Sequence, residues 1–182
     1  MFEVILGCMF SGKSSELQRR VKRSKSIKKK VLVVNHKSDN RYGTDAASIT
    51  HDFQAVAAIK VNKLAEIEHL FLEYDLIAID EAQFFDDLLL IKKYLMTTDF
   101  VIGALSSDSN MNSIGKTLEL IPCCDNVIYL QALCEICSTR QNSPHPRVTH
   151  ASFTKKRVTT TDIIDVSGKD KYYPVCRQCF MK

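Results

Sequence analysis

The sequence predicts an α/β fold: a mostly parallel sheet flanked by helices, followed by a small metal-bound subdomain near the C-terminus. Three observations support this prediction. Apolar, strand-like runs alternate with segments of helical spacing, a phosphate-binding loop pattern follows the first run, and four of the seven cysteines form two close pairs late in the chain. With 182 residues, 45% of them hydrophobic, the chain can bury the core of one domain with a small appendage.

The strand and helix patterns alternate along the chain. Strands are predicted for the apolar runs at residues 2–6, 31–34, 76–79, 100–105 and 127–130. The run V-L-V-V at 31–34 is typical of a strand buried on both faces, as in a parallel sheet. Helices are predicted at 15–21, 64–71, 88–95 and 117–121, the last of which stops at Pro122. Because the two patterns alternate, we expect a mostly parallel sheet covered by helices.

A phosphate-binding loop is predicted directly after the first strand. Residues 7–14 read G-C-M-F-S-G-K-S, a full match to G-x-x-x-x-G-K-[ST]. In such a loop the backbone N–H groups and the following helix N-terminus point at phosphate, while the lysine neutralises charge and the last hydroxyl ligates Mg²⁺. The alternative is a glycine-rich turn with an unrelated lysine. The predicted nucleoside triphosphate site comprises Gly7, Cys8, Met9, Phe10, Ser11, Gly12, Lys13 and Ser14.

Two acidic residues, Asp80 and Glu81, follow the strand at 76–79. A carboxylate at the end of a strand, in the same sheet as a phosphate loop, is typical of a magnesium ligand, and we assign this role to Asp80. Because one carboxylate suffices for the metal, Glu81 is left to accept a proton from an attacking hydroxyl or water. The alternative is that the pair only caps the helix that follows.

The paired cysteines are Cys134 and Cys137, then Cys176 and Cys179. The C-x-x-C spacing lets two thiolates of each pair converge on one tetrahedral Zn²⁺, so we predict a closed, structural four-cysteine site. A redox pair or inert cysteines are the alternatives. Cys8, Cys123 and Cys124 lack partners at metal-binding spacing and are interpreted as ordinary small residues.

The composition changes after Leu133 and becomes polar, with prolines and cysteines. We therefore predict a phosphate-loop α/β domain over residues 1–133 and a zinc-binding subdomain over 134–182. The latter could not fold on a core of its own, and zinc would pin both of its ends.

Several classes of protein are disfavoured by bulk properties. No apolar run approaches the ~20 residues that span a membrane, and the chain enters its first strand without a leader pattern, so we expect a cytoplasmic protein without a membrane partner. The net charge of +4 is too small to imply a nucleic-acid partner, and the basic run at 19–30 is interpreted as a solvated helix face. A GTPase is disfavoured because residues 35–39 have one residue too many for the N-K-x-D motif.

Together, residues 7–16, residues 79–85 (I-D-E-A-Q-F-F) and the late cysteine pairs resemble the type II thymidine kinases, the zinc-containing family of cells and poxvirus-like viruses. The resemblance extends to Asp39-Asn40-Arg41-Tyr42, to Thr50-His51-Asp52 and to parts of 151–179. It implies a kinase that transfers the ATP γ-phosphoryl group to the 5′-hydroxyl of thymidine, giving thymidine monophosphate for DNA synthesis. The implied cofactors are ATP, Mg²⁺ and structural Zn²⁺, and the implied assembly is a homotetramer with no stable nucleic-acid partner.

The resemblance also implies roles for individual residues. Glu81 would be the catalytic base, Lys13 and Arg41 would stabilise the transferred phosphoryl group, and Ser14 and Asp80 would position Mg²⁺. Asp39 and Gln83 join the cofactor-binding set. A loop called the lasso would close over the nucleoside. The implied substrate-binding residues are Met9, Phe84, Leu105, Ser109, Ile114, Ile163, Ile164, Asp165, Val166, Ser167 and Tyr172. For Met9 and Phe84, plain core packing is an equal alternative.

Three departures from the family pattern bear on specificity. Ser109 and Ile114 stand where aromatic residues commonly pack on the nucleoside, and the basic pair of that segment is absent. Ser167 replaces the first glycine of a Gly-Gly pair in the lasso, and the stretch between the cysteine pairs is longer around 142–146. The first alternative function is therefore a deoxynucleoside kinase of broader base specificity. A second, less favoured one is a zinc-containing ATPase that depends on nucleic acid.

Overall fold

The computed structural model describes residues 1–39, 47–48, 56–139, 148–157 and 171–182. A seven-stranded sheet in the order β3-β4-β2-β5-β6-β1-β7 forms its main body. Its strands are β1 (Phe2–Gly7), β2 (Val31–His36), β3 (Ala47–Ser48), β4 (Val56–Val61), β5 (Leu76–Ile79), β6 (Asp99–Leu105) and β7 (Asn126–Leu130). All neighbouring pairs are parallel except β3 with β4. The predicted α/β class is confirmed.

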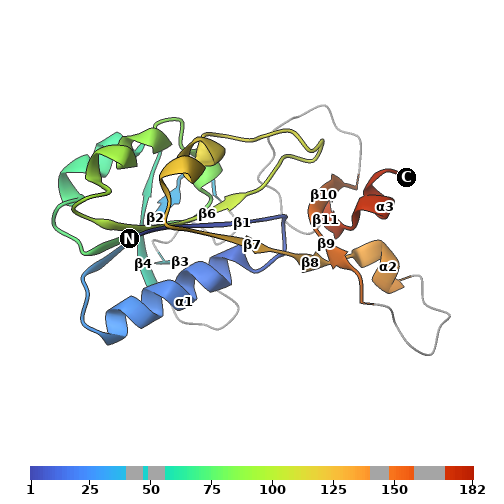
Figure 1. Ribbon diagram of the computed structural model, residues 1–182, viewed down its shortest axis with the longest axis horizontal. Helices are drawn as coiled ribbons and strands as arrows, with labels where there is room; N and C mark the ends of the chain where they lie inside the picture. Colours follow the sequence, from blue (N-terminus) through green and yellow to red (C-terminus); the bar gives the residue numbers. More distant parts are fainter. Residues whose placement is uncertain (40–46, 49–55, 140–147, 158–170) are drawn as a thin grey trace.

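The sheet lies between two helical layers, as Figure 1 shows. Helix α1 (Lys13–Ser26) covers one face, where its Leu17 and Val21 pack with Val33 and Ala78. Leu17 and Val21 are four residues apart and therefore lie on the same side of the helix. Glu16 in the first turn and Arg23 and Lys25 in the last suit the helix dipole.

The other face is covered by short 3-10 helices, three of which lie at the predicted helix positions 64–71, 88–95 and 117–121. They are η1 (Leu64–Leu70), η2 (Ala82–Phe84), η3 (Leu88–Tyr94) and η4 (Thr117–Cys123). Their apolar side chains, such as Leu64, Leu88 and Leu120, join the larger core. The expected stop at Pro122 is wrong, because a proline near a helix end costs little and the N–H of Cys124 closes the last turn on Ile121 O at 3.2 Å.

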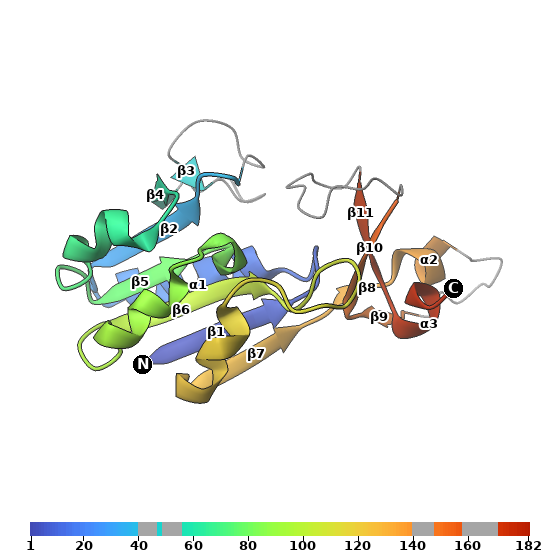
Figure 2. The same ribbon diagram turned by 90° about the horizontal axis from the view of Figure 1, so that it is seen from above.

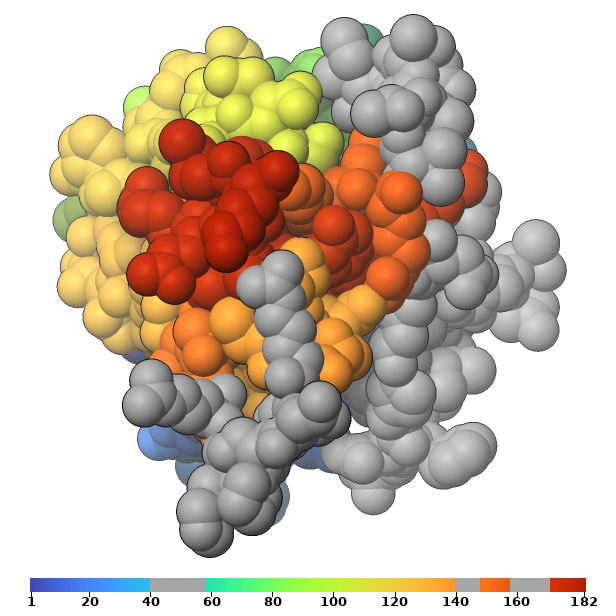
Figure 3. Space-filling model, turned by 90° about the vertical axis from the view of Figure 1, so that its right-hand side faces the viewer, coloured from blue at the N-terminus to red at the C-terminus, as the bar shows by residue number. Residues whose placement is uncertain are grey.

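A smaller C-terminal part lies beyond the carboxyl ends of β1 and β7 (Figures 1 and 2). It holds two two-stranded antiparallel sheets. Its elements are β8 (Ala132–Leu133), α2 (Glu135–Thr139), β9 (His150–Ala151), β10 (Phe153–Lys156), β11 (Tyr172–Val175) and α3 (Arg177–Phe180). In Figure 3 the last residues, in red, occupy the centre of this end of the molecule. The sequence predicts no strand between 127–130 and the first cysteine pair, and this is wrong, because β8 lies there and pairs with β9.

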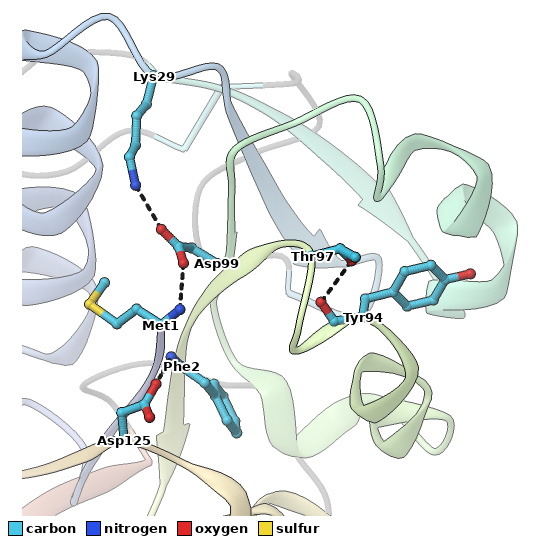
Figure 4. A network of polar contacts seen from close by, with 7 residues as sticks. All are labelled: Met1, Phe2, Lys29, Tyr94, Thr97, Asp99 and Asp125. Atoms are coloured by element: carbon cyan, nitrogen blue, oxygen red, sulfur yellow. Dashed lines mark hydrogen bonds and ion pairs between the residues drawn. The ribbon is translucent and has the colours of Figure 1, made fainter.

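At the opposite end of the sheet, polar contacts tie the starts of the strands together (Figure 4). Lys29 Nζ donates to Asp99 Oδ2 at 2.7 Å, and the amine of Met1 donates to the other carboxylate oxygen of Asp99. The N–H of Phe2 donates to Asp125 Oδ2 at 2.6 Å, and Thr97 Oγ1 donates to the Tyr94 carbonyl. The contacts of Asp99 and Asp125 join β6, the segment after α1 and the residue before β7 to the start of β1.

Asp99→Asn is expected to lower the free energy of unfolding by about 0.2–1 kcal/mol at pH 7, the range for partly exposed ion pairs. Partial burial alone would raise the pKa of the Asp99 carboxyl, but the contacts from Lys29 and the amine outweigh it and hold that pKa below its ordinary value. A depressed pKa stabilises the fold above the unfolded value of about 4, and this contribution is lost as pH falls through the folded value. Urea unfolding of both proteins at neutral and acidic pH measures this contribution to the free energy of unfolding.

In that experiment the difference between the wild type and Asp99→Asn should shrink as the pH falls below about 4. Asp86→Asn is the matched control, because Asp86 is exposed and should show little difference at any pH. A destabilisation by Asp99→Asn that is unchanged at acidic pH would contradict the assignment to charge.

Within the described residues, no helix has both the length and the apolar character required to cross a bilayer.

Candidate active site

The phosphate loop bridges β1 and α1 in a conformation that depends on its glycines. A Cβ at Gly7 would lie 2.5 Å from both the Leu130 carbonyl oxygen and Ser11 Oγ, so only glycine fits against β7. Gly12 has φ of 86° and turns the chain into α1 from the left-handed region. The buried Oγ of Ser11 has no hydrogen-bond partner among the described residues. A tight loop with an unsatisfied polar atom ahead of a helix N-terminus fits a triphosphate.

The loop lysine is largely buried and bridges the loop. Lys13 Nζ donates to the Cys8 carbonyl oxygen at 2.8 Å. Ser14 follows it in the first turn of α1 and is partly exposed. The ammonium group and the hydroxyl therefore lie where the loop meets the helix, as the sequence pattern predicts. Phe10 is exposed and has φ of 63°, a conformation uncommon for a residue other than glycine.

Asp80 and Glu81 lie at the carboxyl end of β5, and both are buried. Asp80 Oδ1 accepts the Glu81 N–H at 3.0 Å. The neighbouring β6 leaves room for the Asp80 carboxylate through a glycine: a Cβ at Gly103 would lie 3.1 Å from Asp80 Oδ1. The alternative that the pair only caps a helix finds no support for Glu81, since the side chain of Glu81, directly before η2, makes no capping hydrogen bond.

Glu81 has a strained backbone and a defined partner. Its φ of 51° and ψ of 43° are left-handed, which costs of order 1–3 kcal/mol at a residue that is not glycine. Gln83 Nε2 donates to Glu81 Oε2, and Gln83 Oε1 accepts the Leu105 N–H at 3.0 Å. Gln83 thus holds Glu81 against the end of β6. The resemblance assigns Gln83 to cofactor binding, and its contacts here are with these two predicted site residues.

Gly115 supports the same arrangement from the segment after β6. It has φ of 63°, and a Cβ there would lie 2.3 Å from the Gln83 carbonyl oxygen. Within that segment, the Asp108 carboxylate accepts the N–H groups of Asn110 and Asn112, each at 2.8 Å. Ser109 lies in this turn. The aspartate-centred turn occupies the place where the family pattern has aromatic and basic residues.

The remaining predicted nucleoside-binding residues are divided between the two parts of the protein. Phe84 is half-buried in η2, where its ring centroid lies 5.9 Å from that of His36. Leu105 and Ile114 are half-buried on either side of the aspartate-centred turn. Tyr172 is buried in β11, where the Lys156 ammonium group lies 5.8 Å from its ring centroid.

The phosphate loop also contacts the C-terminal part. The Met9 N–H donates to Thr154 Oγ1 at 3.0 Å, and the Cys8 thiol donates to the Ala151 carbonyl at 3.3 Å. Burial raises the pKa of Cys8, against smaller opposing effects that include the charge of Lys13, so Cys8 acts as a buried thiol in the C-terminal core. Met9 is half-buried. Two hydrogen bonds therefore tie the phosphate loop to the C-terminal part.

The four paired cysteines meet at one point. The sulfur atoms of Cys134, Cys137, Cys176 and Cys179 all lie within 4.8 Å of one another. The Cys137 sulfur is 3.9 Å from that of Cys176 and 3.6 Å from that of Cys179. With Zn–S bonds of about 2.3 Å, a tetrahedral zinc site needs sulfurs about 3.8 Å apart. The donor set and its spacing fit a structural zinc ion.

The four thiols do not ionise equally while no cation lies between them. Burial alone would raise the pKa of Cys134, but hydrogen bonds from the backbone and thiols at Cys176 and Cys137 bring it to about 7. Burial and hydrogen bonds with the other thiols raise the pKa of Cys179 to about 12. Four thiolates this close require positive charge between them, which Zn²⁺ supplies.

Some predicted residues lie outside the described ranges: Arg41, Ile163, Ile164, Asp165, Val166, Ser167 and the stretch 142–146. Asp39 is described and is buried just after β2, where its carbonyl accepts a 3.4 Å hydrogen bond from Lys60 Nζ.

Sequence reasoning gave no role to Gly103 or Thr154. A glycine within a strand pattern can mark a close approach of another group, and that signal was present at Gly103. Thr154 gave no local signal, because its partner Met9 is distant in sequence.

A phosphate loop between a strand and a helix, with carboxylates ending a strand of the same parallel sheet, defines an α/β protein of the phosphate-loop class. Comparison with known proteins narrows this class. The model of the family described as thymidine kinase matches residues 1–180, and the chain belongs to the thymidine kinase family.

Individual relatives agree in length as well as in sequence. A thymidine kinase of Choristoneura fumiferana entomopoxvirus is 36% identical, over 98% of this chain and 95% of its own. One of Yaba monkey tumor virus is 38% identical, over 98% and 93% of the two chains. One of vaccinia virus, strain Ankara, is 33% identical, over 98% and 96%.

Gly103→Ala is expected to lower kcat about tenfold, because a Cβ there displaces the Asp80 carboxylate by a few tenths of an ångström. The melting temperature should change little, since alanine is no worse than glycine inside a strand. Steady-state kinetics at saturating substrates measure kcat, and thermal unfolding measures the melting temperature. An unchanged kcat would show that the position of Asp80 does not limit turnover.

Proposed function

We propose that this chain is an ATP-dependent thymidine kinase, which transfers the ATP γ-phosphoryl group to the 5′-hydroxyl of thymidine. The observation that carries the proposal is the buried Asp80–Glu81 pair at the end of β5, in the same sheet as the phosphate loop. Phosphoryl transfer needs alignment, charge stabilisation and a group that orients the attacking hydroxyl, and these residues offer all three. We infer that the acceptor is thymidine because its relatives are named thymidine kinases.

The residues divide the chemistry among themselves. The loop from Gly7 to Ser14 binds the triphosphate through its N–H groups, and Lys13 leaves the Cys8 carbonyl to neutralise the β- and γ-phosphates. Ser14 and Asp80 would hold Mg²⁺, which would neutralise charge on the phosphates. Glu81, oriented by Gln83, accepts the proton of the 5′-hydroxyl as that oxygen attacks. Arg41 would stabilise the transferred phosphoryl group, and Asp39, near it in sequence, would contribute to cofactor binding.

The acceptor side is proposed to lie between the aspartate-centred turn and the C-terminal part. Met9, Phe84, Leu105, Ser109 and Ile114 would contact the base and sugar, with Tyr172 and the lasso residues Ile163, Ile164, Asp165, Val166 and Ser167 closing over them. The coupling of Met9 to Thr154 supports this arrangement, since one segment of the loop reaches the part that carries the lasso.

The C-terminal part is proposed to be a zinc-bound subdomain that keeps the lasso in place. Its four thiolates supply the closed donor set of a structural site. Its first strand, β8, begins just before the predicted boundary at residue 134. We further propose that the enzyme is a cytoplasmic homo-oligomer, a tetramer by analogy with the family.

The experiment that tests the function is an ATP-dependent phosphorylation assay with thymidine, deoxyuridine, deoxycytidine and the purine deoxynucleosides. We expect thymidine to have the highest kcat/KM. Failure of the zinc-replete protein to phosphorylate any of them would refute the proposal. A comparable kcat/KM for deoxycytidine would instead favour the broader deoxynucleoside kinase, and ATP turnover stimulated by single-stranded DNA alone would favour the nucleic-acid-dependent ATPase.

A further inference from the structure

The side chain of Asn35 is a buried polar group whose amide oxygen the described fold leaves unpaired. Asn35 lies near the carboxyl end of β2 and is only 2% exposed. Its Oδ1 has no hydrogen-bond partner within the part of the chain that the structure describes. Buried polar atoms in folded proteins are almost always paired, so this acceptor calls for a donor beyond the contacts that the described residues make with one another.

The alternation of β2 places Asn35 on the face of the sheet that α1 covers. Leu32 and Val34 join the core under the 3-10 helices, while Val33 packs with Leu17 of α1. Successive side chains of a strand point to opposite faces, so Asn35 shares the side of Val33. His36 follows the same alternation, and its ring contacts Phe85 under the 3-10 helices with a centroid distance of 4.9 Å.

The register then places Asn35 beside Asp80. Val34 of β2 pairs with Ile79 of β5, and the Asp80 N–H donates to the Val34 carbonyl at 3.0 Å. The next residue along each strand is therefore Asn35 on β2 and Asp80 on β5. On its other side Asn35 pairs with Lys60 of β4.

Asn35 and Asp80 thus lie at the same edge of the sheet and on the same face as the helix that begins with Lys13 and Ser14. The unpaired group is an acceptor and needs a donor. Phosphate oxygens are acceptors as well and do not satisfy it. A water bound to Mg²⁺ is a donor, and Mg²⁺ in proteins keeps several of its waters.

We propose that the amide oxygen of Asn35 accepts a hydrogen bond from a water ligand of the Mg²⁺ that accompanies ATP, next to Asp80. Asn35 is then a positioning residue, which acts on the reaction through the metal ion and not on the nucleoside. The proposal rests on the proposed kinase function for its metal, but metal-dependent binding of ATP tests it without any turnover.

Asn35→Leu is the informative variant, because leucine has a similar size and removes the unpaired acceptor. The ligand-free variant should melt at the same temperature as the wild type or higher, since it no longer buries the unpaired amide oxygen of Asn35. Its affinity for ATP in the presence of Mg²⁺ should fall about 10-fold or more, as removal of groups around a metal site commonly does. Its affinity for ATP in EDTA should be unchanged.

Isothermal titration of ATP with Mg²⁺ or with EDTA gives both affinities, and thermal unfolding gives the stability. Asn35→Asp keeps an acceptor at the same place and should retain the gain in affinity that Mg²⁺ provides. Asn62→Leu makes the same chemical change at an exposed position after β4 and should alter neither measurement.

Two results would overturn the proposal. One is a melting temperature well below that of the wild type for both Asn35 variants, which would make the side chain a structural residue. The other is an effect of Asn35→Leu on ATP affinity that is the same with Mg²⁺ and with EDTA, whether that effect is a loss or none. If the chain binds Mg·ATP but phosphorylates no nucleoside, the proposed function fails while this titration still decides the role of Asn35.

Discussion

Glu81→Gln is expected to lower kcat for thymidine phosphorylation about 10²- to 10⁴-fold, the contribution typical of a general base. Glutamine has the size of glutamate but does not accept the proton of the attacking hydroxyl. ATP binding should persist, because the triphosphate is held by the loop from Gly7 to Ser14 and not by Glu81. Steady-state kinetics and equilibrium binding of Mg·ATP measure the two effects separately.

The local structure around Glu81 should tolerate this change. Gln83 Nε2 donates to the Glu81 carboxylate, and the carbonyl oxygen of a glutamine at 81 can accept the same hydrogen bond. The melting temperature is therefore expected to stay close to that of the wild type. Glu73→Gln, at an exposed position before β5, is the matched control and should leave kcat unchanged. Near wild-type turnover by Glu81→Gln would remove Glu81 from the role of base.

The central architecture could be predicted because its signals are local. The run L-I-A-I at 76–79 is apolar throughout and ends in two acidic residues, and the strand has the predicted bounds. β4 was not predicted, because its lysine and alanines weaken the strand pattern of Val56–Val61. The strands of two residues in the C-terminal part carry no pattern at all. β8 exists because it pairs with β9, whose residues are distant in sequence.

The site residues could likewise be predicted from local sequence, whereas the contacts that position them could not. Asp80 and Glu81 are adjacent to a recognisable strand, and the loop lysine lies in a fixed motif. The hydrogen bond from Leu105 to Gln83 and the close approach of Gly103 to Asp80 depend on the β5–β6 register. The position of Asn35 depends in the same way on the register of β2 with β5. Register is a tertiary property, so these relations appear only in the folded chain.

Loss of the zinc site should have the largest effect on stability. Cys137→Ser removes one ligand at a half-exposed position, which separates loss of metal from loss of core packing. Loss of a structural metal belongs to the few changes that destabilise proteins by more than about 4 kcal/mol. For a chain of this length, that corresponds to a fall in melting temperature of about 10 °C.

Metal analysis should find about one zinc per wild-type chain and much less in Cys137→Ser. Cys123→Ser is the matched control, since Cys123 is exposed and lies outside the four-cysteine cluster. It should keep both its zinc and its melting temperature. A fully stable, active Cys137→Ser protein without zinc would contradict a structural role for the metal.

The same variant should also weaken ATP binding, because the C-terminal part that carries the four cysteines contacts the phosphate loop. Ala151 and Thr154 contact Cys8 and Met9 of the loop, and Cys8 belongs to the same core as Cys134 and Cys176. If the cysteines move apart in Cys137→Ser, the packing of that core is disturbed. The loop should then lose the hydrogen bonds that Cys8 and Met9 make with it. Thr154→Val removes only the Oγ1 acceptor for Met9 and leaves the cysteines in place. If zinc acts on the loop through this contact, Thr154→Val should reproduce part of the loss of ATP affinity while retaining its zinc.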